Sequence, residues 1–199
     1  KKSLNISVDD KIILTTSRLV KKNGIKDLID AVYLLATRYS PALPVGRLPV
    51  TLVICGNGEE SQKLEIRSKQ LGIEDKVKFV GFVPPEELPK YYAIADVFCR
   101  PSLSEGLGIS FLEAMAAGVP VIGTQVGGIP DFLQDGVTGW FCEVNNPTSI
   151  AEKIKWVLDE KNKEEVEKVT ENARVMVEQE YNWEKIATQM NHIFHKLSN

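Results

Sequence analysis

Short runs of apolar and β-branched residues alternate with segments of helical periodicity along this chain of 199 residues. Continuous apolar runs, such as 12–17 and 50–55, indicate strands buried on both faces, as in a parallel sheet. Further strands are predicted over 77–80, 96–100, 119–124 and 136–142. The alternation predicts a doubly wound, Rossmann-like α/β fold: a parallel sheet of about six strands with helices on both faces.

Helices are predicted between and after these strands. They lie over 25–37, from the turn at Gly56 to about residue 72, and over 86–95, 163–178 and 183–197. A short helix is predicted after the turn Gly127–Gly128. Another helix opens near Asn146, where Ser149 and Glu152 fit a capping box. A connector over 38–49 contains several prolines and is predicted to lie far from the chemistry, because it joins a helix to the following strand.

Right-handed crossovers place every strand-to-helix loop at one edge of such a sheet. The loops that meet there are the basic segment after Ser17, the turn at Gly56, the loop at Gly81, the segment 101–108 and the turn Gly127–Gly128. Five short loops with small or polar residues therefore converge, and this convergence predicts a ligand site at that edge.

The segment 101–122 reads as a loop with two glycines, a helix and a buried strand. Backbone amides of such a loop can face a phosphate, and the start of a helix adds a favourable dipole. The carboxylate of Glu113 can accept two hydrogen bonds from a ribose, and Glu105 lies beside the loop. The alternative is an ordinary strand–loop–helix unit with two solvated acids.

Arg18 and Lys22 follow the first strand, where cations can neutralise the charge of a diphosphate. A basic loop can equally be a solvated surface. The pair Gly56 and Gly58 is too short for a dinucleotide fingerprint. His192 and His195 are interpreted as surface residues, and no metal site is expected.

The formal net charge of −3 argues against a nucleic-acid binder. The sequence has no apolar run long enough for a bilayer and no signal peptide, and a start at Lys1 suggests a piece of a longer chain. Cys55, Cys99 and Cys142 are scattered, so we expect buried free thiols in a reducing cytoplasm.

Several segments occur in an order that resembles the C-terminal, donor-binding half of a GT-B-fold retaining glycosyltransferase of family four (glycosyl transferases group 1). They are 17–24, 56–58, 79–81, 95–97, 101–122, 127–131 and 136–139. The resemblance covers nearly the whole chain and implies one domain over 1–199 that binds a UDP-, GDP- or ADP-linked sugar.

The resemblance also implies roles for individual residues. Arg18 and Lys22 would meet the donor diphosphate, Glu105 would lie near the transferred sugar, and Glu113 would hold the ribose. The remaining implied donor-binding residues are Gly106, Leu107 and Gly108 for the sugar and phosphates, Gly81, Phe82 and Val83 beside the nucleobase, and Gly56. Two departures are Asn23, where the family usually has a lysine, and Asp131, where glutamate is commoner. Either Lys22 supplies the missing charge, or the phosphate site is weaker than in the family.

The resemblance implies no cofactor and no catalytic metal. It implies an N-terminal acceptor domain in the same protein, on which the helix over 183–197 would pack, and a cytoplasmic location with peripheral membrane association through that missing half. Two other functions stay open: a nucleotide-sugar epimerase of the GT-B type, and a non-catalytic nucleotide-sugar-binding module.

Overall fold

The computed structural model describes residues 1–37 and 48–197, which form one parallel sheet in the order β3-β2-β1-β4-β5-β6. The six strands are β1 (Lys11–Thr16), β2 (Val50–Cys55), β3 (Val77–Gly81), β4 (Val97–Cys99), β5 (Val121–Thr124) and β6 (Trp140–Cys142). The predicted Rossmann-like fold of six parallel strands is therefore confirmed.

Strand β1 lies at the centre and pairs with a neighbour on each side. Ile13 is aligned with Leu52 of β2 and with Val97 of β4. Every residue of β2 is buried, which explains its continuous apolar sequence. The order of the strands reverses between β1 and β4, and ligands of open α/β sheets bind outside the carboxyl ends of strands at such a point.

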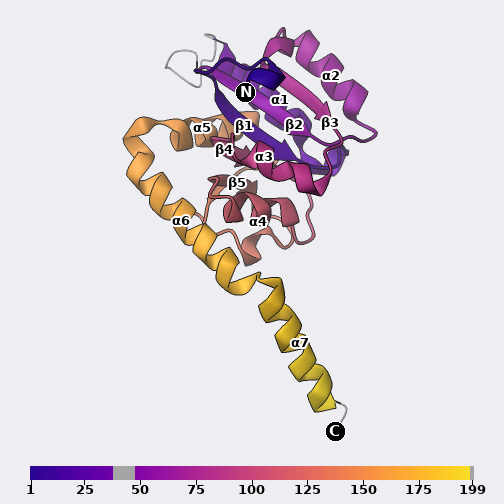
Figure 1. Ribbon diagram of the computed structural model, residues 1–199. Helices are drawn as coiled ribbons and strands as arrows, with labels where there is room; N and C mark the ends of the chain where they lie inside the picture. The colour runs from indigo at the N-terminus through magenta and orange to yellow at the C-terminus, as the bar shows by residue number, and fades with distance from the viewer. Residues whose placement is uncertain (38–47, 198–199) are drawn as a thin grey trace.

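Helices cover both faces of this sheet (Figure 1). One buried cluster includes α1 (Ile25–Ala36), α2 (Ser61–Gln70) and α5 (Pro147–Leu158). The cluster on the opposite face includes α3 (Leu88–Tyr92) and α4 (Ile109–Ala116). The long helix α6 (Lys163–Glu180) joins the two, since Val166 packs in the first cluster and Ala173 in the second.

Three local predictions need correction. Asn146 caps α5, because its side chain accepts a hydrogen bond from Ser149 N at 3.1 Å. The hydroxyl of Ser149 instead accepts from Glu143 N at 3.0 Å, so the predicted capping box is wrong. The helix predicted over 86–95 is a 3-10 turn at Pro85–Glu87 followed by the short α3, and the segment after Gly128 is a 3-10 turn at Ile129–Asp131. The predicted connector lies outside the described residues, except for its last two.

The last helix, α7 (Trp183–Leu197), extends away from the sheet beyond α6 (Figure 1). Several of its apolar side chains are open to solvent: Trp183 is 80% exposed and Phe194 is 55% exposed. The predicted packing of this helix on a second domain remains a prediction. Across the described residues, no helix combines the length and the apolar character that crossing a membrane requires.

Candidate functional site

The five predicted loops do meet at the carboxyl edge of the sheet. Backbone hydrogen bonds join each loop to the next, so that the five loops form one row. Gly56 N donates to Gly81 O at 2.7 Å, and Leu19 N donates to Asn57 O at 2.8 Å. The loop after β4 continues this row, because Leu103 N donates to Lys22 O at 2.6 Å. Gly128 N completes it by donating to Gly106 O at 3.0 Å. The edge is therefore one connected surface.

Close backbone contact between loops requires glycine at several places in this row, of which Gly24 and Gly127 flank the segment 101–108. A Cβ atom on Gly24 would lie 1.9 Å from the carbonyl oxygen of Pro101, and one on Gly127 would lie 1.8 Å from that of Glu105. Both glycines also have positive φ, +69° and +55°. These residues hold the segment 101–108 between the loops on its two sides.

A hollow of about 730 Å³ opens on this edge. The candidate residues that line it come from four of the loops and from α4, and they are Arg18, Gly56, Phe82, Val83, Glu105, Leu107, Gly108 and Glu113. Gly81 and Gly106 do not line it themselves, but each is next in sequence to a residue that does, Phe82 for Gly81 and both Glu105 and Leu107 for Gly106. The structure thus brings together the residues that the sequence placed at one site.

Lys22 lies in an adjoining hollow of about 580 Å³, which also contains Lys21 and Asn23. Arg18, Arg100 and Glu105 line both hollows. Asn23 is buried, and its Nδ2 donates to Arg18 O at 2.6 Å, so it supports the backbone of the basic loop without supplying a charge.

Glu113, on α4, is held by a neighbouring helix. The hydroxyl of Tyr92, on α3, donates to Glu113 Oε2 at 2.8 Å and lies 3.0 Å from Thr16 Oγ1 at the end of β1. Burial, together with the nearby Glu113 charge, raises the pKa of Tyr92 far above the ordinary value, so the hydroxyl keeps its proton. The carboxylate therefore has one fixed orientation at the hollow.

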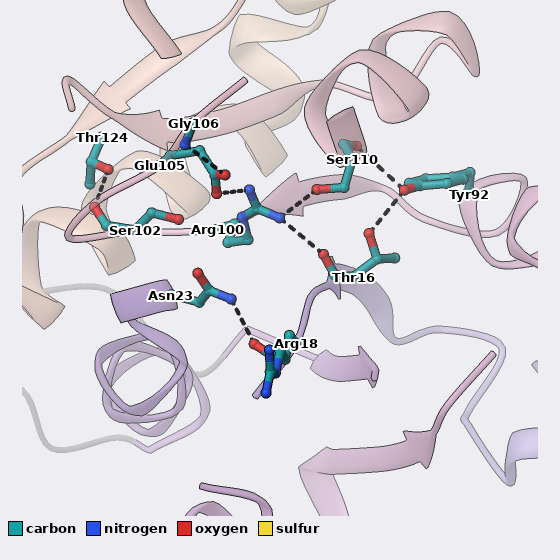
Figure 2. A network of polar contacts seen from close by, with 10 residues as sticks. All are labelled: Thr16, Arg18, Asn23, Tyr92, Arg100, Ser102, Glu105, Gly106, Ser110 and Thr124. Carbon is teal, nitrogen blue, oxygen red and sulfur yellow. Dashed lines mark hydrogen bonds and ion pairs between the residues drawn. The ribbon is translucent and has the colours of Figure 1, made fainter. Parts of the chain in front are cut away.

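Glu105 forms an ion pair with Arg100, and Figure 2 shows this pair at the centre of a polar network. Arg100 Nη1 donates to Ser110 Oγ at 2.7 Å and to Thr16 O at 3.3 Å. The other carboxylate oxygen of Glu105, Oε1, accepts from Gly106 N at 3.1 Å. Burial lowers the pKa of Arg100, and the Glu105 charge partly offsets this effect.

Sequence reasoning missed Arg100, Tyr92 and Ser110. Arg100 had a detectable signal, since it is a charged residue at the end of an apolar strand run, directly before Pro101. Tyr92 and Ser110 had none, because an isolated tyrosine or serine on a predicted helix is common. Cys55 also lines the hollow, but burial raises its pKa to about 12, so it stays a neutral thiol.

The predicted free and buried state of all three cysteines is confirmed. Within residues 1–37 and 48–197, no group of three His, Cys, Asp or Glu side chains is arranged to hold a metal ion. The expectation of metal-independent chemistry stays a prediction.

The fold and the site together define a doubly wound α/β domain with a row of hydrogen-bonded loops at its switch point. Comparison with known families assigns it more narrowly. The family description "Glycosyl transferases group 1" matches residues 1–176, and the chain belongs to this family. The family resemblance inferred from the sequence is confirmed.

Two curated relatives match almost the whole chain. The uncharacterized glycosyltransferase MJ1607 of Methanocaldococcus jannaschii is 36% identical over 194 residues, which are 98% of this chain and 47% of that protein. The N-acetyl-alpha-D-glucosaminyl L-malate synthase of Bacillus anthracis is 33% identical over 195 residues, 98% of this chain and 48% of the synthase. The chain thus spans about half the length of these relatives.

The solved structures also agree with the fold. The crystal structure of Anabaena Alr3699/HepE in complex with UDP and glucose has a TM-score of 0.85 and 23% sequence identity. The match covers 98% of this chain and 50% of that one. Like the two curated relatives, the Anabaena protein is about twice as long as the part of it that matches this chain.

Proposed function

We propose that this chain is the donor-binding domain of a retaining glycosyltransferase that transfers a sugar from a nucleoside diphosphate. The observation that carries this proposal is the hollow of about 730 Å³, where Arg18, Glu105 and Glu113 lie together at the switch point of the sheet. A cation and two carboxylates around one hollow suit a ligand that has both a diphosphate and hydroxyl groups.

Each part of the donor has a chemically suitable group. Arg18 and Lys22 meet the diphosphate, and Glu113 accepts hydrogen bonds from the ribose. Glu105 faces the sugar, while Phe82, which is 69% exposed, lies against the nucleobase with Val83. During transfer the leaving diphosphate gains negative charge, which the cations and the amino end of α4 stabilise without a metal ion or cofactor.

Isothermal titration calorimetry with UDP, GDP and ADP tests this proposal and identifies the base. We expect one of them to bind at submillimolar concentration, with the same affinity when EDTA is present. Absence of binding by all three at millimolar concentration would contradict the proposal. A requirement for Mg²⁺ would contradict only its metal-independent part.

Transfer itself requires an acceptor site, which we assign to an N-terminal domain of the same protein. The exposed apolar side chains of α7 support this assignment, because a partner domain would cover them. We further propose a cytoplasmic location, at the inner face of the membrane when the acceptor is a lipid. Free buried thiols are compatible with such a reducing compartment.

A further inference from the structure

Arg100 is a buried cation inside the wall of the proposed site. It follows β4, is 6% exposed, and lines both the main hollow and the adjoining basic hollow. Its guanidinium carbon lies 5.0 Å from the centre of the Phe111 ring, so one face of the group is covered by an apolar surface. The resemblance assigns no role to this residue.

The guanidinium joins the loop after β4 and the start of α4 to the end of the central strand, which is distant in sequence. It pairs with Glu105 in the loop, donates to Ser110 on α4, and donates to the carbonyl of Thr16 at the end of β1. Its Nε atom is buried and has no hydrogen-bond partner among the described residues. All three partners line the hollow, and Figure 2 shows them around the guanidinium of Arg100.

Stability alone does not account for a buried ion pair at this position. Removing two charges from water is unfavourable, and well-packed apolar residues often stabilise a protein equally well. The pair does fix the carboxylate, since one oxygen of Glu105 faces Arg100 and the other accepts from Gly106 N. A carboxylate has about four acceptor positions, so Glu105 retains capacity for hydroxyl groups of a ligand.

We propose that Arg100 is a positioning residue, which holds the carboxylate of Glu105 correctly oriented toward the sugar of the donor. This inference rests on the proposed function and adds a residue to it. Arg100 acts through Glu105, whereas Arg18 and Lys22 contact the diphosphate. Loss of Arg100 therefore weakens recognition of the sugar and has little effect on recognition of the nucleoside diphosphate.

The test compares UDP-glucose with UDP, or the corresponding GDP or ADP pair if it binds more tightly, by calorimetry on this chain. The quantity measured is the ratio of the dissociation constant of the nucleotide sugar to that of its diphosphate. In Arg100→Met we expect this ratio to rise about tenfold, with the affinity for the diphosphate changed less than threefold. Arg174→Met, which removes a paired arginine on α6, is the matched control and leaves both affinities unchanged.

The double variant Arg100→Met/Glu105→Gln separates positioning from a general structural role. If Arg100 acts through Glu105, the double variant has the same ratio as Glu105→Gln alone, and Arg100→Lys partly restores the wild-type ratio. Additive effects would overturn the proposal. An equal loss of affinity for diphosphate and nucleotide sugar would also overturn it, because it would identify Arg100 as a phosphate ligand.

Ser110→Ala provides a second route if Arg100→Met does not fold. This variant keeps both charges and removes the 2.7 Å hydrogen bond that fixes the guanidinium. We expect a two- to fivefold rise in the ratio, and an unchanged ratio would count against positioning. If the wild-type chain binds no nucleotide at all, the proposed function fails, whereas binding with an unaltered ratio in these variants refutes only the role of Arg100.

Discussion

The hydroxyl of Tyr92 lies between Glu113 and Thr16, donating to the carboxylate at 2.8 Å and lying 3.0 Å from the threonine hydroxyl. These three residues belong to α3, α4 and β1, so one buried phenol sets the relative position of two helices and the central strand. The orientation of Glu113 at the hollow therefore depends on a residue that does not itself line it.

Replacing Tyr92 with phenylalanine removes this support and leaves the ring in place. We expect the affinity for the nucleoside diphosphate to fall three- to tenfold, or about 1 kcal/mol, because Glu113 loses one ordering hydrogen bond. Calorimetry measures this change. Tyr33→Phe on α1 is the matched control and should leave the affinity unaltered; an equal effect of the two changes would refute the proposed link to Glu113.

Glu113→Ala removes the acceptor assigned to the ribose. We expect at least a tenfold loss of affinity for the nucleoside diphosphate, or about 1.4 kcal/mol. Glu171→Ala on α6 removes an exposed carboxylate that pairs with Arg174 and should have little effect on binding. Equal affinities in the two variants would argue against a role of Glu113 in binding ribose.

Gly127→Ala should disrupt the contact between neighbouring loops, since the new Cβ atom would lie 1.8 Å from the carbonyl oxygen of Glu105. Gly136→Ala is a matched control with positive φ and no atom within 4 Å of the added group. The control should lose about 1–2 kcal/mol of unfolding free energy from backbone strain alone. We expect Gly127→Ala to lose at least about 2 kcal/mol more in urea denaturation, and similar losses would contradict this contact.

Asp10 lies at the opposite end of the sheet, where it accepts from Thr51 Oγ1 at 2.6 Å and from Lys76 Nζ at 2.9 Å. Burial alone would raise the pKa of this carboxyl, but the hydrogen bonds from Thr51 and Lys76 and the charges of Lys76 and Lys1 together outweigh burial and lower it. The charged form is therefore the one that the folded state favours.

The pH dependence of stability follows from this direction. The stabilisation by Asp10 is complete above its unfolded pKa of about 3.9 and disappears as the pH falls through the lower folded-state pKa. Asp10→Asn should lose about 1–3 kcal/mol of unfolding free energy at pH 7, and the difference from wild type should shrink below pH 4. Urea denaturation at several pH values measures it, and a constant difference would contradict the assignment.

The strands and the position of the site were predictable because each has a local signature. Runs such as 50–55 are apolar throughout, and the order of strands and helices fixes which loops share an edge. Which side chains form hydrogen bonds and ion pairs with one another was not predictable. Arg100 pairs with Glu105, five residues further along the loop after β4, and Tyr92 donates to Glu113, 21 residues away on α4. At α5 either Asn146 or Ser149 could cap the helix. The helix begins at Pro147, so Asn146 is the capping residue and Ser149 lies inside the first turn.

The backbone bonds that join the five loops limit how ligand preference can evolve in this domain. A substitution inside that row, for example at Gly127, would displace the neighbouring loop as well as the loop that contains the substituted residue. Phe82 and Leu107 line the same hollow but project from the row, with 69% and 49% of their surface exposed. Selection for a new base or sugar can therefore act on these two positions while the framework that carries them stays unaltered.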